Sequence, residues 1–302
     1  MARKTDTKSS KELPGFVKRG RRLKEGTTLE HLIKKGMTEV AKYDRRGRIY
    51  ASGAAFCPRQ TVFGSILTST EIQSAASKGY MSIGSAIEEM ITDALYKSDA
   101  LLFKQYRLPD MGLDMGGYID AIVWSDSKIR ALEIKSCSSI PSKPKPEHIA
   151  QALTYSSAIG MPISILYFSR SVANYNGELQ MREFQLEFSN ESMVSILFNI
   201  CFSRLCITNN VAPPKPEGWN QKECGYCPFI PICWEGEDVP MDVLSGDERV
   251  KLMKRAKDMA ENLASNEQVK IRRTGVLNFL EKNGSDFAKK LLKGSNWDEL
   301  VL

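Results

Sequence analysis

The chain has 302 residues, of which 42 are Lys or Arg and 36 are Asp or Glu, so its formal net charge is +6 at pH 7. This mildly basic balance permits a partner that carries phosphates but does not require one. No apolar run approaches the roughly 20 residues that span a bilayer, and the start of the chain lacks an apolar signal segment. We therefore expect an intracellular, cytoplasmic protein without a membrane contact, built from one main domain and smaller extensions.

The two ends of the chain differ in composition from the middle. Residues 1–26 hold nine Lys or Arg against three acidic residues, which predicts a flexible basic arm that either grips nucleic acid or stays solvated. Residues 27–237 are expected to form the main domain. Residues 238–302 are a C-terminal extension, in which residues from about 247 to 302 alternate apolar and charged residues in helical fashion. This extension is expected to form two or three helices, broken at Gly275, Gly284 and Gly294, and to offer a surface for a protein partner or for self-association.

A first strong helix is predicted after Ser82, which is a candidate N-cap. Its apolar residues follow helical spacing and form one stripe, made of Ile83, Ile87, Met90, Ile91, Ala94 and Leu95. Glu88 lies beside this stripe, one turn after Gly84. The helix therefore carries a carboxylate next to the face that it is expected to bury.

A β-hairpin is predicted next, with strands over residues 118–124 and 129–135 that are rich in β-branched residues. If its turn closes symmetrically about Asp126 and Ser127, Asp120 lies directly opposite Glu133. Side chains so paired are roughly 4.5–5.5 Å apart at Cβ, so the two carboxylates repel unless a positive charge sits between them. Lys135 shares the sheet face of Glu133 and adds one cation. A divalent metal is the natural further occupant.

The elements after the hairpin predict an α/β core. A helix is expected over residues 147–159, ending at Gly160, and a short apolar run over residues 163–169 reads as a buried strand. Strand, helix and strand in this order predict a right-handed parallel crossover onto the hairpin sheet. An outer strand over residues 183–188, a helix over residues 192–208 and a stiff proline-rich linker over residues 211–216 follow.

The polar residues of the hairpin suit the hydrolysis of phosphodiesters. Such a centre needs carboxylates to hold Mg²⁺ or Mn²⁺, and a positive group to orient the attacking water or to offset charge in the transition state. Asp120 and Glu133 are the candidate carboxylates, and Lys135 is the positive group. The backbone carbonyl of Ile134 is a further candidate ligand, and Glu88 is a candidate third carboxylate. The alternative is that Asp120 and Glu133 are ordinary exposed strand residues.

The helix after the hairpin carries a second polar set. Gln151 and Tyr155 are four residues apart and share a face with His148. They follow a loop that contains Lys143 and Lys145, so contacts to phosphate and base are one interpretation of this face. A structural role of Gln151 and Tyr155 is the alternative.

The motifs of this region resemble a known nuclease family. In chain order, Gly84 to Glu88, Gly117 to Asp120, Glu133 to Lys135 and Gln151 to Tyr155 are similar to the motif series of the RecB-like branch of the PD-(D/E)XK nuclease superfamily. Glu88 stands where that family often carries a metal-binding His. The resemblance spans roughly residues 57–233 and implies a restriction-endonuclease-like core with a central mixed β-sheet flanked by helices.

The resemblance also implies an activity. It is that of a DNA exonuclease dependent on Mg²⁺ or Mn²⁺, acting on single-stranded DNA or DNA ends in recombination, repair, phage DNA metabolism or CRISPR-type adaptation. Asp120, Glu133 and Lys135 would carry the reaction, assisted by Gln151 and Tyr155. Two alternatives stay open: a site-specific endonuclease, and a catalytically silent iron–sulfur DNA-binding subunit of a larger complex.

Four of the seven cysteines bracket these motifs. Cys57 lies upstream, and Cys224, Cys227 and Cys233 form a C-x2-C-x5-C series downstream. Disulfides are rare inside cells, so four such thiolates predict either a tetrahedral Zn²⁺ site or a [4Fe–4S] cluster. The ligand count does not choose between them. The resemblance favours [4Fe–4S], because iron–sulfur nucleases of this branch split their cysteines in the same way, and it implies a four-cysteine lobe that closes the nuclease domain.

Overall fold

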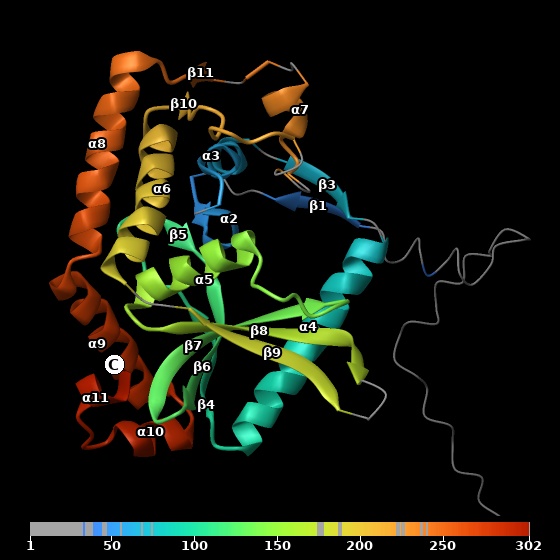
Figure 1. Ribbon diagram of the computed structural model, residues 1–302, viewed down its shortest axis with the longest axis vertical. Helices are drawn as coiled ribbons and strands as arrows, with labels where there is room; N and C mark the ends of the chain where they lie inside the picture. Colours follow the sequence, from blue (N-terminus) through green and yellow to red (C-terminus); the bar gives the residue numbers. More distant parts are fainter. Residues whose placement is uncertain are drawn as a thin grey trace, which may run out of the picture.

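The computed structural model describes most of the chain after the first 32 residues. The described residues are 33, 39–43, 47–54, 56–67, 69–73, 75–173, 178–186, 189–221, 224, 227–235, 238–239 and 241–301. The predicted basic arm over residues 1–26 lies outside them. The remainder is a mixed α/β protein whose central sheet is flanked by helices (Figure 1).

The central sheet has five strands in the order β4-β6-β7-β8-β9. Its strands are β4 (Leu101–Arg107), β6 (Tyr118–Ser125), β7 (Lys128–Cys137), β8 (Ile163–Ala173) and β9 (Leu179–Leu186). β7 and β8 run parallel, and the other neighbouring pairs run antiparallel. The predicted mixed sheet is therefore confirmed, with β9 as an outer strand.

The predicted hairpin forms with the predicted register. β6 pairs with β7 from Ser125 opposite Lys128 to Ala121 opposite Leu132. Asp126 and Ser127 occupy the two turn positions with φ of 52° and 59°, the left-handed values of a type I′ turn. This turn matches the twist of the flanking strands, so it fixes which residues of β6 and β7 face each other.

The crossover from β7 to β8 runs through helix α5 (Pro146–Ile159), as predicted. Gly160 ends α5 with φ of 66°. A Cβ at this position would lie 2.5 Å from the carbonyl oxygen of Val269, so glycine is required both by the backbone angle and by the close approach of a later helix.

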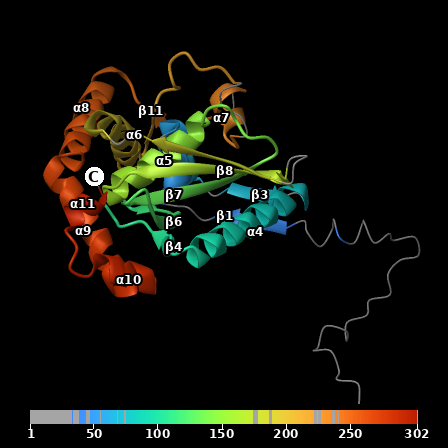
Figure 2. The same ribbon diagram turned by 60° about the horizontal axis from the view of Figure 1, so that its bottom comes forward.

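Helices cover both faces of the sheet. Helix α4 (Ala75–Lys97) lies along one face, whereas α5 and α6 (Asn190–Thr208) lie on the other (Figure 2). On the α4 side, Ile87 and Ile91 pack against sheet residues that include Val123. The predicted start of α4 at Ser82 is wrong, because the helix begins seven residues earlier and the Ser82 hydroxyl donates to the carbonyl of Lys78 instead of capping an end.

Helix α6 is, among the described helices, the one with the length and apolar character of a membrane span. It serves here as a core helix. Leu197, Ile200 and Cys201 are fully buried in the main hydrophobic core, and α6 packs against α3 (Pro58–Ile66), α5 and α8 (Gly246–Leu263).

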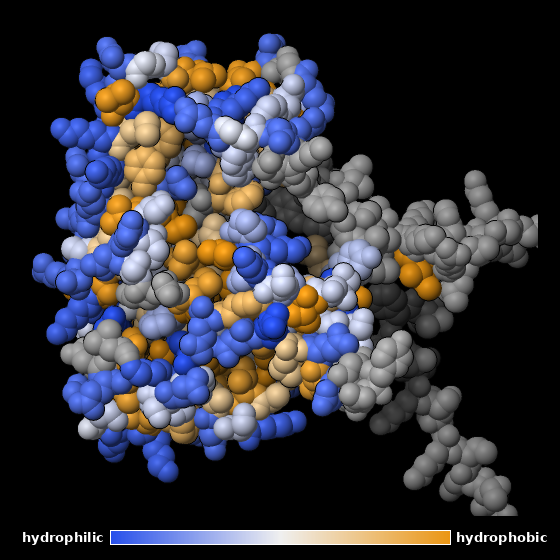
Figure 3. Space-filling view, viewed as in Figure 1, coloured by the Kyte–Doolittle hydropathy of each residue, from blue (hydrophilic) through white to orange (hydrophobic). Residues whose placement is uncertain are grey.

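The C-terminal extension forms helices α8, α9 (Asn266–Asn283), α10 (Asp286–Leu292) and α11 (Trp297–Val301). The predicted break at Gly275 is wrong, because this residue lies inside α9; α8 and α9 are separated at residues 264–265 instead. The inner residues of these helices join the same core as the sheet, and Arg273 Nε donates to the carbonyl of Gly160 at 3.0 Å. The outer face of α8 is hydrophilic (Figure 3).

Short elements complete the fold at the end of the sheet where the hairpin begins. Three two-stranded sheets pair β1 (Glu39–Tyr43) with β3 (Ser69–Gln73), β2 (Ile49–Tyr50) with β5 (Met115–Gly116), and β10 (Val211–Ala212) with β11 (Asp242–Val243). Two short helices, α2 (Ala51–Ala54) and α7 (Ile230–Trp234), lie near them. None of these short elements follows from a sequence pattern.

Candidate active site

The predicted carboxylates meet at the open end of the β6–β7 hairpin. Asp120 Oδ2 accepts a hydrogen bond of 2.7 Å from the backbone N–H of Ile134, the residue after Glu133. Asp120 directly precedes Ala121, the first residue of β6 that pairs with β7, and its carboxylate reaches the neighbouring strand. Ile134 thus enters the site through its N–H, and the role of its carbonyl as a metal ligand stays a prediction.

A chain of polar contacts links the hairpin to α5. Lys135 Nζ donates to Glu133 Oε1 at 2.6 Å and to Gln151 Oε1 at 2.9 Å. Gln151 Nε2 in turn donates to the hydroxyl of Tyr155 at 2.9 Å. Because the amide nitrogen is engaged by Tyr155, the amide oxygen must face Lys135. The structure therefore brings together four of the predicted residues, Glu133, Lys135, Gln151 and Tyr155.

The interpretation of Tyr155 as a nucleic-acid contact needs correction. Its side chain is only 4% exposed and belongs to the hydrophobic core. Burial, followed by the charge of Glu133, raises the pKa of its hydroxyl, so this group is neutral. Tyr155 can orient Gln151 from within the protein, but its ring does not reach a strand bound outside.

Glu88 lies close enough to the pair to affect its titration. It comes from α4, which lies on the face of the sheet opposite to α5, and accepts a hydrogen bond from Gln105 Nε2. Its charge contributes, after burial and other neighbours, to the raised pKa values of both Asp120 and Glu133. The predicted third carboxylate is thus part of the same electrostatic site.

Gln105 is a site residue that the sequence pattern missed. In the β4–β6 ladder, Lys104 pairs with Ala121 and Tyr106 with Ile119, so Gln105 falls opposite Asp120. Its backbone has φ of 55°, a left-handed value that is rare for a side chain such as glutamine and costs of order 1 kcal/mol or more. Because β4 carries other polar residues, no sequence signal distinguishes Gln105 from them.

The surroundings of the two hairpin carboxylates disfavour their charged forms. Burial, with the charge of Glu133 as the second cause, raises the pKa of Asp120 to about 8. Burial also raises the pKa of Glu133, which is 2% exposed, although Lys135 opposes the rise. A buried acid beside a half-buried one favours sharing a proton or binding a cation.

One oxygen of this site fits a metal ligand. Glu133 Oε1 is engaged by Lys135, whereas Glu133 Oε2 is buried and has no hydrogen-bond partner among the described residues. Carboxylate oxygens are the ligands that Mg²⁺ and Mn²⁺ prefer. Within the described part of the chain, no three His, Cys, Asp or Glu side chains already stand at metal-binding spacing. The fold gathers Asp120, Glu133 and Glu88 without drawing them to ligand distances.

His148 has a defined tautomer at the start of α5. Its Nδ1 lies 2.7 Å from the hydroxyl of Tyr167, and that hydroxyl accepts from the backbone N–H of Lys145 at 3.0 Å. Tyr167 is fully buried, so its own proton is satisfied only if it is donated to His148 Nδ1. Neutral His148 therefore carries its proton on Nε2. Burial is the main cause that lowers the pKa of His148 to about 4, and the charge of Lys135 adds to it.

The four predicted cysteine ligands come together from opposite ends of the main domain. Cys57, Cys224, Cys227 and Cys233 line one cavity, which Trp219 and Trp234 also border. Cys57 is the N-cap of α3, Cys224 and Cys227 precede α7, and Cys233 lies within it. The two tryptophans therefore pack at the cysteines.

Three of the four sulfurs accept hydrogen bonds from N–H groups. Trp234 Nε1 donates to Cys224 Sγ at 3.2 Å, and Arg59 Nε donates to Cys233 Sγ at 3.3 Å. The backbone N–H of Gln60 donates to Cys57 Sγ at 3.5 Å. Donors aimed at sulfur stabilise thiolates and are the usual surroundings of metal-bound cysteines.

Two of the four thiols, those of Cys57 and Cys227, are neutral without a metal. Burial is the largest cause that raises the pKa of Cys57 and raises that of Cys227 to about 11, and the neighbouring cysteines add to both shifts. Four thiolates in one cavity require a cation. The donor set therefore fits either Zn²⁺ or an iron–sulfur cluster, whose binding would release protons.

Comparisons with known proteins add little to this geometry. No protein-family model and no curated relative matches the sequence. Among solved structures, the crystal structure of SSO0001 is similar with a TM-score of 0.38 and 16% sequence identity, covering 68% of this chain and 95% of that chain.

Proposed function

We propose that the protein is a metal-dependent nuclease that hydrolyses phosphodiester bonds of DNA. The observation that carries the proposal is the pairing of Asp120 with Glu133 at the hairpin end, where one buried oxygen of Glu133 lacks a partner among the described residues and Lys135 holds the other. An acid pair of which one member is buried, with an adjacent ammonium group, suits a reaction in which negative charge develops on a phosphate.

Asp120, Glu133 and Glu88 would hold Mg²⁺ or Mn²⁺. Such an ion, when bound, supplies Lewis-acid polarisation of a phosphoryl oxygen and favours hydroxide over water. The residues that surround the acids keep water out of the rest of the site, since Glu133 is nearly fully buried. This burial strengthens every charge interaction within the site.

Lys135 would offset the charge that develops on the phosphate. Its ammonium group is held between Glu133 Oε1 and Gln151 Oε1, so two of its three N–H donors have fixed directions. The direction of the third N–H is then fixed as well, and a phosphate oxygen is a suitable acceptor for it. Gln151 is in turn fixed by the buried hydroxyl of Tyr155, which acts as a positioning residue.

Within this activity, we propose an intracellular exonuclease that acts on single-stranded DNA or DNA ends. The motif resemblance supports this choice. The C-terminal helices, whose inner faces join the core, leave Val250 and Ile271 exposed as candidate contacts for a protein partner or a second copy.

We further propose that Cys57, Cys224, Cys227 and Cys233 hold a [4Fe–4S] cluster with a structural role. The shared cavity and the N–H donors aimed at three sulfurs support a metal centre here. The motif resemblance supports iron–sulfur over Zn²⁺. A cluster at this place would connect α3, early in the chain, to the segment around α7.

The proposed activity is tested with labelled linear single-stranded DNA in Mg²⁺, Mn²⁺ or EDTA. We expect degradation with either metal and none in EDTA. Lys135→Ala is expected to lower the rate by about 100-fold or more. Lys128→Ala, a matched change at the turn end of the same strand, is expected to leave the rate unchanged. Circular DNA separates the alternatives, because an exonuclease leaves it intact and an endonuclease cuts it.

A further inference from the structure

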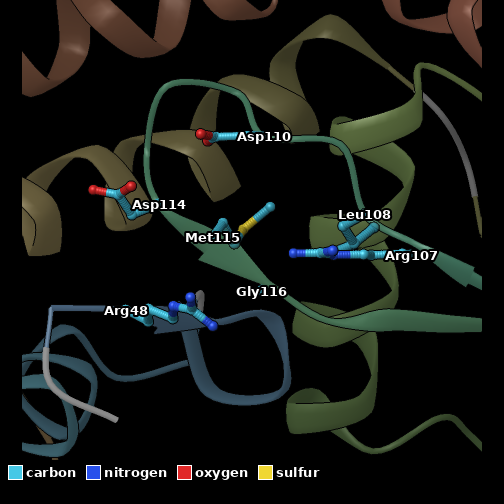
Figure 4. A pocket seen from close by; sticks show the side chains of 7 residues that line it. All are labelled: Arg48, Arg107, Leu108, Asp110, Asp114, Met115 and Gly116. Atoms are coloured by element: carbon cyan, nitrogen blue, oxygen red, sulfur yellow. The ribbon is translucent and has the colours of Figure 1, made fainter.

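A second polar site lies beside the proposed active site. It is a cavity of about 390 Å³ whose lining includes Arg48, Arg107, Asp110, Asp114 and Gly116. Figure 4 shows the two arginines on either side of Gly116, with Arg48 next to β2 and Arg107 at the end of β4. Two arginines that approach one cavity from different elements are a common arrangement for binding an anion.

The acidic residues of this cavity are already engaged. Asp114 forms an ion pair with Arg204. Asp110 Oδ1 accepts from the backbone N–H of Gly112 at 2.9 Å and of Leu113 at 3.3 Å, which holds its loop closed. Neither Asp110 nor Asp114 is therefore committed to the two arginines of the cavity.

The two arginines are exposed and uncommitted. No ion pair or hydrogen bond of the Arg48 or Arg107 guanidinium group is seen within the described part of the chain. Guanidinium groups present several donors in a rigid plane that matches phosphate. The cavity thus combines two acids that are engaged by other groups with two cations that have no partner among the described residues, and a phosphate is the anion that it suits.

The cavity is next to the carboxylates along the same strand. Arg107 pairs with Tyr118 in the β4–β6 ladder, two residues before Asp120. At roughly 3.4 Å per residue, these two levels of the sheet are about 7 Å apart.

Gly117 lies in the chain between Gly116, which lines the cavity, and Asp120. Its carbonyl accepts from the N–H of Leu108 at 3.0 Å. A Cβ at Gly117 would lie 3.0 Å from Leu108 Cδ1 and 3.3 Å from the ring of Tyr155, the residue that orients Gln151. The backbone at Gly117 is therefore closely packed, and the separation of about 7 Å along the sheet lets one strand of nucleic acid reach both sites.

We propose that Arg48 and Arg107 bind a backbone or terminal phosphate of the nucleic-acid strand whose scissile phosphate lies at Asp120 and Glu133. This inference rests on the proposed function and adds the direction in which the strand leaves the carboxylates. The strand runs from Lys135 on β7 past the hairpin end to Arg107 on β4, and on to Arg48.

Binding without cleavage tests this site. Anisotropy of a short labelled single-stranded oligonucleotide is measured in EDTA for wild type, for Arg48→Gln with Arg107→Gln, and for Arg182→Gln. Arg182 is an exposed arginine on β9, at the opposite edge of the sheet. We expect the double variant to bind about tenfold or more weakly. The slope of log Kd against log salt should fall by about 0.7 for each phosphate that the double variant no longer binds. Arg182→Gln should match wild type.

A second arm identifies the phosphate. If 5′-phosphorylated and 5′-hydroxyl oligonucleotides differ in affinity only when the two arginines are present, the cavity takes a terminal phosphate. Equal affinities that both fall in the double variant assign an internal phosphodiester. Unchanged affinity and salt slope in a double variant with wild-type thermal stability would overturn the inference.

The outcome is separable from the proposed nuclease activity. If wild type degrades DNA with Mn²⁺ and the double variant binds as wild type, only the phosphate site is wrong. If the arginines govern binding but no metal supports cleavage by wild type, the phosphate site stands and the nuclease proposal fails.

Discussion

Lys135 Nζ lies 2.6 Å from Glu133 Oε1, although both residues belong to one strand and Glu133 is only 2% exposed. The pair sits on one sheet face because its members are two residues apart in β7. The Lys135 ammonium group binds Oε1 of the Glu133 carboxylate and leaves Oε2 without a partner among the described residues. Loss of Lys135 would leave the buried Glu133 carboxylate without its cation, which is costly, so Lys135 supports both the charge and the stability of the site.

The stability of the metal-free protein should depend on pH through Asp120. Its folded pKa of about 8 lies far above the unfolded value near 4, so between these values the folded state keeps a proton that the unfolded chain has released. The free energy of unfolding should therefore fall as pH rises from about 4 to 8. The window from pH 6.5 to 8 is best, because the opposite effect of His148, whose folded pKa is about 4, acts below pH 6.5.

Urea denaturation in EDTA measures this dependence. The fall should approach about 1.4 kcal/mol per pH unit for one proton. It should be smaller in Asp120→Asn and should disappear in wild type with Mn²⁺, because the cation replaces the proton. An Asp120→Asn variant with the wild-type pH dependence would contradict the assignment of this titration.

Gln151 should act on the rate through Lys135. Gln151→Leu removes the acceptor at 2.9 Å from Lys135 Nζ, so the ammonium group keeps only one of its two fixed hydrogen bonds. We expect kcat to fall by about 10–100-fold while KM changes little, as for other residues that orient a reacting group. Gln185→Leu, on exposed β9, is the matched control. An unchanged kcat in Gln151→Leu would show that Gln151 has no role in the site.

Variants of Gln105 should separate the effect of backbone strain on stability from the effect of site geometry on cleavage. Gln105→Gly removes the strain of φ at 55° but also removes the amide that donates to Glu88. The greater freedom of glycine in the unfolded chain offsets the relief, so we expect stability within about 1 kcal/mol of wild type. Gln105→Val, which keeps the strain, should be less stable than Gln105→Gly.

The dependence of cleavage on Mn²⁺ completes this test. Both Gln105 variants should need more Mn²⁺ for half-maximal cleavage, because Glu88 is no longer held. If Gln105→Gly cleaves at the wild-type Mn²⁺ concentration, Gln105 has no positioning role.

The cysteine centre should be visible in the purified protein. Prepared without oxygen, wild type should be brown with absorption near about 400 nm, and Cys57→Ala should lose iron and melt at a lower temperature because cluster binding is coupled to folding. Cys137→Ala is the matched control, since Cys137 does not line the cysteine cavity. A colourless protein with one zinc per chain would show that the site holds zinc and not iron. Iron retained in Cys57→Ala would contradict the ligand set.

The parts of the fold that local patterns determine were predictable. The hairpin register follows from the two-residue turn at Asp126 and Ser127, and α5 ends at Gly160 because a left-handed residue is needed there. The start of α4 was misplaced at Ser82, because a serine inside a helix can bond to a carbonyl one turn earlier as well as cap an end.

The parts that depend on long-range contacts were not predictable. The pairing of β2 with β5 joins residues more than 60 positions apart over two residues each, which leaves no periodicity to detect. Gln105 reaches the site because its backbone is irregular. Tyr155 is absent from the expected binding surface because the core covers its ring. The Arg48 and Arg107 cavity likewise combines elements that no local motif connects.

In the proposed nuclease, the Glu133 carboxylate binds the metal from a buried place that disfavours its charge, and Glu133→Gln tests this role most directly. This variant removes the buried negative charge and keeps the shape of the side chain. Metal-free stability at pH 8 and Mn²⁺-dependent cleavage of linear single-stranded DNA are measured for wild type, Glu133→Gln and the exposed control Glu281→Gln. We predict that Glu133→Gln is at least as stable as wild type and cleaves about 100-fold or more slowly, whereas cleavage by Glu133→Gln at the wild-type rate would contradict the account.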